Sequence, residues 1–253
     1  MKITFLGTGT SQGIPMIANN EPVCLSDNPR DKRLRSSIMI SWNDIRYIVD
    51  CGPDFRQQML RENIQSINGV LFTHEHADHT AGIDDLRPYT YKMGEVPIYA
   101  QERVIENLKV RFSYIFETEN RYAGAPKLTE NTIDSTSFML SGVQVTPLAV
   151  MHGNLPITGY RFGNVAYITD LKTMSDQEKK KLENLEILIV NALRIDAHPT
   201  HLNLEEALAF VNEIKPKRAY FTHISHKLGF HEDVEKILPE NVFLSYDGLQ
   251  ITL

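Results

Sequence analysis

A cluster of metal-ligating side chains constrains this chain more than any other feature. The segment GVLFTHEHADHTAGIDD, residues 69–85, begins with an apolar run that predicts a strand, and a chain with only 9 histidines places three of them within the next few residues. The donors on the loop after the strand are His74, His76, Asp78 and His79. Imidazole nitrogen and carboxylate oxygen are ligands for zinc, manganese or iron.

Four donors on one short loop cannot all point at a single small ion with tetrahedral geometry. Division of the donors between two neighbouring ions fits better, and hydrolases often hold two such ions about 3.5–4 Å apart. The plain alternative is a histidine-rich surface loop. One isolated histidine usually has a structural role, but the pattern H-x-H-x-D-H after an apolar strand favours a metal site.

Composition limits the remaining possibilities. The chain has 253 residues, is 42% hydrophobic, and has no Pro/Ser/Gly-rich linker or repeat, so we expect a single domain over residues 1–253. The net charge of −6 argues against a protein that coats nucleic acid through a broad basic face. Cys24 and Cys51 form no disulfide framework, and no run approaches the ~20 apolar residues of a membrane span. We therefore expect a cytoplasmic protein that does not insert into a membrane.

Strand-like and helical patterns alternate along the chain. The predicted strands are Ile3–Leu6, Ile38–Ser41, Arg46–Val49, Gly69–Phe72, Pro97–Tyr99, Gln144–Leu148, Ile157–Arg161, Ala166–Ile168, Ile187–Val190, Ala219–Phe221, Val242–Leu244 and Gln250–Leu253. The predicted helices are Asp54–Glu62, Glu102–Tyr114, Asp176–Glu183, Leu204–Lys215 and Glu232–Leu238. The early strands form a meander and the later ones alternate with helices, which favours an α/β sandwich with helices outside the sheets.

Two local signals are specific enough to test. Asn203 can cap the helix that begins at Leu204, and Glu206 can reach back to it, which is a capping box. The segment Tyr246–Leu249 reads YDGL, and Asp-Gly suits a type I′ turn. The pattern therefore predicts a hairpin between the last two strands.

The motif THEHADH resembles the signature of the metallo-β-lactamase fold, an αβ/βα four-layer sandwich. The remaining motifs of that family follow in order, so the resemblance covers nearly the whole chain. Asp50 in YIVDCGPD matches an aspartate that orients the metal-binding loop. His152 in AVMHGN, Asp170 in AYITDL and His223 in AYFTHISH match the later ligand positions.

The resemblance implies a division of the ligands between two divalent ions, Zn²⁺ or Mn²⁺ with Fe²⁺ also compatible. The first ion would be held by His74, His76 and His152. The second would be held by Asp78, His79 and His223, with Asp170 bridging both. Two such ions lower the pKa of a shared water, which gives hydroxide near neutral pH, and polarise a substrate oxygen.

Departure of the leaving group needs a proton donor, and His201 in PTHLNLEEAL is the candidate. It precedes the Asn203 cap, in a loop that can face a site. Its position resembles the catalytic histidine of the phosphodiesterase branch of the family. The alternative is an ordinary surface loop residue.

The sequence favours the phosphodiesterase branch. The diiron redox relatives carry glutamate where this chain has His76, and the thioesterase relatives place their last ligand in a separate helical region, whereas His223 follows a predicted strand. The tRNA 3′-processing endonucleases carry an arm between the motifs of His152 and Asp170, and this chain leaves no room for one. The stretches GTGTSQGIP, RLRSS, HLNLEEAL and THISH resemble the phosphoribosyl 1,2-cyclic phosphate phosphodiesterase family.

That resemblance implies a small phosphate ester, either cyclic or open, as substrate, and it argues against nucleic acid as a ligand. Endoribonuclease and thioester hydrolase activity remain the alternatives. A metal-bound protein with a binding or regulatory role and no turnover is a third, against which the intact Asp78, Asp170 and His201 argue. A homodimer is open, because relatives are often dimers. Arg33, Arg35 and Ser37 could contact a substrate phosphate. The equally good alternative makes them ordinary loop and strand residues.

One departure from the family concerns a structural zinc site. Relatives carry C-x-C-x-x-C after the glycine-rich opening, and the aligned positions here are Asn19, Glu21 and Cys24. Only Cys24 and His226 remain as strong ligands, so we expect that site to be empty or very weak. Other contacts must then hold the loop. We expect His198 and His231 to be structural, the glycine-rich opening to be a tight turn bordering the site, and residues 111–122 to be a packing helix and loop.

Overall fold

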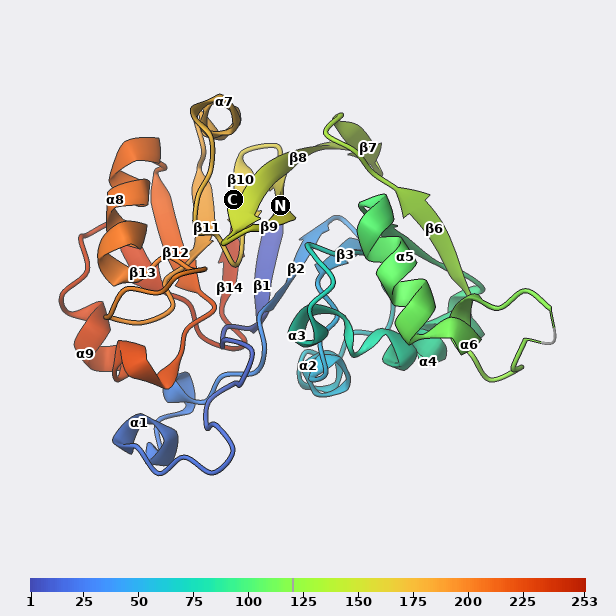
Figure 1. Ribbon diagram of the computed structural model, residues 1–253, viewed down its shortest axis with the longest axis horizontal. Helices are drawn as coiled ribbons and strands as arrows, with labels where there is room; N and C mark the ends of the chain where they lie inside the picture. Colours follow the sequence, from blue (N-terminus) through green and yellow to red (C-terminus); the bar gives the residue numbers. More distant parts are fainter. Residues whose placement is uncertain (120) are drawn as a thin grey trace. The chain divides into compact units, whose positions relative to one another are not determined.

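The computed structural model describes residues 1–119 and 121–253, and the chain divides into two compact units. The first unit comprises Met1–Leu6, Ser37–Asp134 and Gln250–Leu253, and the second comprises Gly7–Ser36 and Ser135–Leu249. Each unit is built on one seven-stranded mixed sheet with helices packed against it (Figure 1). Mixed sheets flanked by helices agree with the predicted α/β sandwich class.

The sheet of the first unit changes from antiparallel to parallel along its length. Its strands, in spatial order, are β14 (Gln250–Thr252), β1 (Lys2–Gly7), β2 (Ser37–Trp42), β3 (Ile45–Val49), β4 (Gly69–Leu71), β5 (Val96–Ala100) and β6 (Leu128–Thr132). The pairs β14–β1 and β2–β3 are antiparallel, and β3 to β6 pair in parallel. The chain ends meet here, because the Leu253 amide donates to the Met1 carbonyl at 2.9 Å.

Short helices cover one face of this sheet. They are α2 (Phe55–Arg61), α3 (Ala77–Thr80), α4 (Arg87–Met93), α5 (Glu102–Arg111) and α6 (Ser113–Phe116), with a 3₁₀ turn at Ile83–Leu86. In Figure 1, α4 and α5 lie beside the β5–β6 side of the sheet, in agreement with their contacts. Their apolar faces pack on Ile48, Val70 and Ile98 of β3, β4 and β5, which forms the core of this unit.

The second unit combines an antiparallel meander with a parallel half. Its strands, in spatial order, are β13 (Val242–Leu244), β12 (Arg218–Thr222), β11 (Ile187–Asn191), β10 (Val165–Ile168), β9 (Leu155–Phe162), β8 (Val143–His152) and β7 (Phe138–Leu140). Strands β7 to β10 are antiparallel neighbours, and β10 to β13 run parallel. The parallel arrangement brings the carboxyl ends of β10, β11 and β12 to one edge of the sheet.

The helices of this unit are α1 (Pro22–Leu25), α7 (Asp176–Lys179), α8 (Leu204–Ile214) and α9 (His231–Glu235), with 3₁₀ turns at Pro29–Asp31, Lys180–Leu182 and His226–Leu228. In Figure 1, α8 lies along the parallel strands of its sheet. The capping box predicted for α8 is confirmed, because the Glu206 amide donates to Asn203 Oδ1 at 2.9 Å and the Asn203 amide donates to Glu206 Oε2 at 3.0 Å. Of the described helices, none is long and apolar enough to cross a membrane.

Differences from the predicted elements have local causes. The helix expected over residues 102–114 is interrupted at Phe112, whose φ of −124° lies outside the helical range. The helix expected over residues 176–183 ends as α-helix at Lys179 and continues as a 3₁₀ turn. Strand β6 was not predicted because its sequence, LTENT, is mostly polar and lacks an apolar alternation.

The hairpin predicted at Tyr246–Leu249 is wrong. Strand β13 pairs with β12 and β14 pairs with β1, so the two strands belong to different sheets. A turn does form, since the Leu249 amide donates to the Tyr246 carbonyl at 3.0 Å, but of its central residues only Gly248 has positive φ. The Asp247 carboxylate instead accepts from Thr8 Oγ1 and from the Leu34 amide, each at 2.8 Å, so it anchors distant parts of the chain.

Arg33 is a structural residue of the second unit, and its side chain does not fit the role of a substrate contact. Its Nη1 donates to Thr8 Oγ1 at 2.8 Å and to the Ser245 carbonyl at 2.6 Å, and its Nη2 donates to His231 Nδ1 at 3.0 Å. The residue is 3% exposed, and burial lowers the pKa of Arg33 to about 10. His231 accepts this bond and is itself 2% exposed, so its structural role is confirmed.

His231 should make folding sensitive to acid. Burial, with the nearby Arg33 and Arg30 charges, lowers the pKa of His231 to about 4, whereas an unfolded histidine titrates near pH 6.5. Between these values the unfolded state binds more protons, so the folded state loses stability as the pH falls from about 6.5 towards about 4. Urea unfolding of the wild type and of His231→Gln over pH 4–8 should therefore give parallel pH profiles above pH 6.5. Below pH 6.5 the free energy of unfolding of the wild type should fall more steeply than that of the variant. An equally steep or shallower fall in the wild type would contradict this assignment.

Candidate metal centre

Three of the predicted site residues turn the backbone sharply where a strand ends. Asp50 follows β3 with φ of 67°, Asp170 follows β10 with φ of 57°, and His223 follows β12 with φ of 55°. Positive φ in residues other than glycine costs on the order of 1–3 kcal/mol each. Such conformations persist only where surrounding contacts hold them, and each of these residues has such contacts.

In the first unit, the buried carboxylate of Asp50 organises the loop after β4. Its Oδ1 accepts from the Thr73 amide at 2.8 Å and from Thr73 Oγ1 at 3.0 Å, and its Oδ2 lies 2.7 Å from His79 Nδ1. Burial raises the pKa of Asp50, while His79 and the Thr73 donors oppose that shift. Because His79 Nδ1 donates to Asp50, Nε2 is the ring nitrogen that can act as a ligand.

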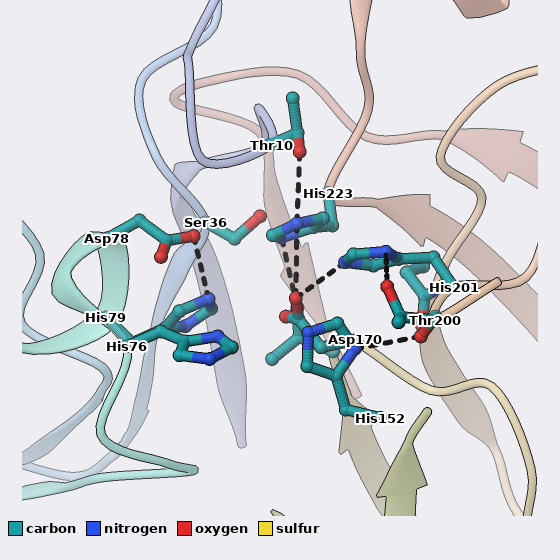
Figure 2. Close-up of polar contacts among 12 residues, drawn as sticks. Thr10, Ser36, His76, Asp78, His79, His152, Asp170, Thr200, His201 and His223 are labelled. Carbon is teal, nitrogen blue, oxygen red and sulfur yellow. Dashed lines mark hydrogen bonds and ion pairs between the residues drawn. The ribbon is translucent and has the colours of Figure 1, made fainter. Parts of the chain in front are cut away.

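The other donors of this loop face one another. His74 Nε2 and His76 Nδ1 are 2.9 Å apart, and Thr73 Oγ1 lies 3.0 Å from His74 Nδ1. The Asp78 carboxylate lies 3.1 Å from His79 Nε2. Figure 2 marks this contact with a dashed line. The rings of His74 and His79 are 4.3 Å apart between centroids. The structure therefore brings together the four donors that the sequence predicted on this loop.

Helix α5 supports the same loop from outside. Arg111 Nη1 donates to the Glu75 carbonyl at 2.6 Å and to Thr80 Oγ1 at 3.0 Å, and Thr80 Oγ1 donates to the His76 carbonyl at 2.8 Å. Arg103 forms an ion pair with the Glu75 carboxylate. Sequence reasoning missed these arginines, and their only local signal was a pair of basic residues on the predicted helix.

In the second unit, the donors gather around Asp170. Its Oδ2 accepts from Thr169 Oγ1 at 2.6 Å, and its Oδ1 lies 2.9 Å from His201 Nε2 and 3.2 Å from His223 Nε2 (Figure 2). His152, at the end of β8, donates from Nδ1 to the Thr200 carbonyl at 2.8 Å, so Nε2 is the ring nitrogen that could act as a ligand.

His201 is not an ordinary surface residue. It is 9% exposed, and its ring stacks on that of His223 at 5.0 Å and an interplanar angle of 17°. Its Nδ1 lies 3.0 Å from Thr200 Oγ1 and 3.1 Å from His198 Nδ1. The ligand atoms of His152, Asp170 and His201 lie within 4.8 Å of one another, so His201 could serve as a proton donor or as a ligand.

The glycine-rich opening forms the predicted tight turn beside these donors. The Gly13 amide donates to the Thr10 carbonyl at 2.8 Å, and Gly13 has φ of 64°. Thr10 Oγ1 lies 3.1 Å from His223 Nε2. In the first unit, the Ser37 hydroxyl donates to the Asp50 carbonyl at 2.8 Å. Ser37 therefore supports the backbone turn at Asp50.

The loop with the missing cysteines is held by polar contacts. Asn19 Nδ2 lies 3.3 Å from His226 Nε2, and Glu21 Oε1 lies 3.4 Å from the same atom. Cys24 is 3% exposed and belongs to the apolar core of the second unit. Lys32 Nζ also donates to the Cys24 carbonyl at 3.1 Å. An amide and a carboxylate therefore contact His226, at two of the positions where the family resemblance led us to look for cysteines.

The donor chemistry of both units fits divalent cations. His79 and His152 each have one ring nitrogen engaged by an oxygen acceptor, and this arrangement is typical of histidines that bind metals. Carboxylates of Asp78 and Asp170 add hard oxygen donors, which zinc, manganese and iron all accept.

Comparisons with known proteins identify relatives of the whole chain. Residues 45–224 match the model of the β-lactamase superfamily domain. An octanoyltransferase of Porphyromonas gingivalis is 38% identical over 254 residues, which cover 99% of this chain and 51% of that relative. A ribonuclease Z of Methanococcus maripaludis is 25% identical, with 100% of this chain and 68% of the relative covered. The chain thus spans about half the length of the first of these curated relatives.

Solved structures extend the comparison. A crystal structure of a new diphosphatase from the PhnP family is 39% identical, with a TM-score of 0.93, and the match covers 100% of this chain and 97% of that one. Human tRNase Z, short form, is 18% identical with a TM-score of 0.70 over 100% of this chain and 99% of that one, which shows a shared fold alone.

Replacement of Asp50 should loosen the loop of the first unit and weaken metal binding. Asp50→Ala leaves the buried Thr73 amide and His79 Nδ1 without their acceptor, which should cost about 3 kcal/mol of stability. Loss of such an outer partner typically weakens metal binding by about 10- to 100-fold. Chelator competition and urea unfolding measure both effects, with the exposed Asp44→Ala as control. Unchanged metal affinity in a folded Asp50→Ala protein would refute this role.

Metal analysis can distinguish whether His201 is a proton donor or a metal ligand. If His201 is a proton donor, His201→Ala should keep the metal content of the wild type and lose about 10²–10⁴-fold in kcat on a substrate with a basic leaving group. The metal content is measured by inductively coupled plasma mass spectrometry after gel filtration. Loss of one metal equivalent would instead assign His201 as a ligand.

Proposed function

This chain belongs to the β-lactamase superfamily, and we propose that it is a metal-dependent hydrolase that cleaves a small phosphate ester. The observation that carries this proposal is the likeness to the PhnP-family diphosphatase, at 39% identity over the full chain. A phosphoribosyl 1,2-cyclic phosphate is the ester that the sequence motifs favour. The diphosphatase name points to the related cleavage of a diphosphate.

We propose that the seven predicted donor residues bind a pair of divalent ions. His74, His76 and His152 would hold the first ion, Asp78, His79 and His223 would hold the second, and Asp170 would serve both. The family resemblance and the imidazole orientations of His79 and His152 support this assignment. When bound, the ions supply Lewis acidity to a phosphoryl oxygen and lower the pKa of water.

The chain's own residues then have separate tasks. Asp50 holds His79, and the Thr200 carbonyl holds His152, so that the ligand nitrogens keep fixed directions. His201, with both ring nitrogens protonated, transfers one proton to the oxygen that leaves phosphorus and becomes neutral. The attacking water releases one proton in the same turnover, and that proton restores His201.

The nature of the leaving group decides how much His201 matters. A ring-opening cleavage expels a sugar alkoxide, which is strongly basic and needs a proton as it departs. Cleavage of a diphosphate expels phosphate, whose second pKa is about 6, so that protonation contributes little. The sensitivity of each reaction to loss of His201 therefore distinguishes the two substrate classes.

Thioester hydrolysis is the second candidate, because the relative at 38% identity is named an octanoyltransferase. That relative is about twice as long as the matched segment, so its name does not assign acyl transfer to this half. An RNA substrate has less support. The interval from His152 to Asp170 holds only β9, β10 and short turns, which leaves no arm there to grip RNA.

The function is tested by phosphorus NMR of the metal-loaded protein with ribose 1,2-cyclic phosphate 5-phosphate and, separately, with a nucleoside diphosphate sugar. We expect ring opening or diphosphate cleavage by the wild type, and a loss of more than about 10³-fold in Asp170→Ala, because the bridging ligand is gone. Asp176→Ala removes a carboxylate that is 93% exposed and should leave the rate unchanged.

Octanoyl thioester and a short RNA serve as competing substrates in the same assay. Hydrolysis of the thioester or RNA alone, with the metal content verified, would overturn the phosphate-ester assignment. Activity on the cyclic phosphate that survives in Asp170→Ala would overturn the assignment of Asp170 to the metals.

A further inference from the structure

Asn191 is a buried amide at the carboxyl end of β11, and sequence reasoning did not consider it. Its side chain is fully buried. Oδ1 accepts from the Leu171 amide at 2.6 Å, and Nδ2 donates to the Leu171 carbonyl at 3.1 Å. A single side chain thus clamps both polar groups of the residue that directly follows Asp170.

The clamp also reaches the loop of His201. The Leu171 carbonyl accepts a second bond from the Leu202 amide at 2.8 Å, and the Leu202 carbonyl accepts from the Leu193 amide at 3.0 Å. Leu171 directly follows Asp170, and its carbonyl is hydrogen-bonded to Leu202, which directly follows His201. A change at Asn191 would reach both side chains through one backbone link.

The neighbouring strand brings His223 close to the same point. Asn191 is in register with Thr222 of β12, and the Ala192 amide donates to the Thr222 carbonyl at 3.1 Å. His223 is the next residue of the chain. The end of β11 therefore adjoins the segments that carry three of the predicted site residues of this unit.

The composition of β11 argues that this amide serves more than the packing of the sheet. The four preceding residues of the strand, Ile187–Val190, are apolar and buried, and Ala192 and Leu193 follow. A buried amide must be desolvated, and it offsets that cost only when its hydrogen bonds are made. Asn191 makes bonds to Leu171 that an apolar side chain could not make.

The backbone of Asp170 explains why such a clamp is needed. Its φ of 57° is strained for a residue other than glycine. Without the bonds at Leu171, relaxation of this turn would swing the carboxylate away from His201 and His223. The Asn191 bonds hold the residue after Asp170, and the Thr169 hydroxyl, from the residue before it, donates to the Asp170 carboxylate.

We propose that Asn191 is a positioning residue, whose amide fixes the Leu171 peptide and thereby the directions of Asp170 and His201. The inference rests on the proposed function for the roles of those two residues. Metal binding by the metal-depleted protein tests it without any substrate, so it can fail or hold independently of the substrate assignment.

The experiment compares Asn191→Leu, which removes both bonds and keeps the branching of the side chain, and Asn191→Asp, which keeps only the acceptor, with a matched control. Val190→Ala creates a cavity in the same strand and should cost about 2–4 kcal/mol while both hydrogen bonds between Asn191 and Leu171 remain. Circular dichroism and urea unfolding establish folding and stability. Zinc titration in competition with a chromophoric chelator gives the affinity, and kcat and KM follow on any substrate that the wild type cleaves.

We expect both Asn191 variants to lose about 10- to 100-fold in zinc affinity. Their kcat should fall while KM stays close to that of the wild type, and excess metal should restore part of the lost activity. Val190→Ala should keep the wild-type affinity at a similar loss of stability. Equal losses of affinity in the Asn191 variants and Val190→Ala would overturn the proposal. Wild-type affinity in folded Asn191 variants would also overturn it. Unfolding of both Asn191 variants while Val190→Ala stays folded would overturn it as well, because the amide would then be required for the stability of the sheet.

Discussion

The imidazoles of His79 and His152 are each held in direction by an oxygen atom that binds one ring nitrogen. In the first unit this oxygen belongs to Asp50, which binds His79 Nδ1 and also fixes Thr73 at the start of the donor loop. In the second unit it is the Thr200 carbonyl, which binds His152 Nδ1. The same device therefore occurs in both units, with a carboxylate in one and a peptide group in the other. Since a metal ion needs a fixed lone pair, these contacts prepare the protein for a cation.

Backbone strain is the second constraint on the site. Asp50, Asp170 and His223 all adopt left-handed conformations directly after or near strand ends, where the sheet no longer dictates the path of the chain. Each is held by bonds from segments far away in sequence. For Asp170 the Asn191 clamp acts on the following peptide. A site of this kind concentrates strain at the donors and distributes the compensating bonds over buried neighbours.

Charged residues near such a site do not all serve the substrate. The RLRSS stretch looked suited to phosphate, yet the Arg33 guanidinium is buried against Thr8, Ser245 and His231. Asp247, expected to shape a hairpin, instead receives bonds from Thr8 and Leu34. Both residues hold the N-terminal loop of the second unit in place. Substrate choice must then come from groups other than Arg33.

Local patterns were sufficient for much of the fold and for the chemistry of the donors. Apolar alternation predicted most strands, including the strand before the donor loop, and the Asn203 capping box was visible in four residues. The polar strand β6 and the pairing of β14 with β1 were not predictable, because neither leaves a periodic apolar signal or a short-range partner. The sequence by itself determined which donors exist and their spacing on the loop, since both are properties of neighbouring residues. Only the tertiary structure decided which ring nitrogen is available and which peptide Asn191 clamps. The partners of Asp50, His152 and Asn191 lie 20 to 48 residues away, and their contacts exist only once the chain has folded.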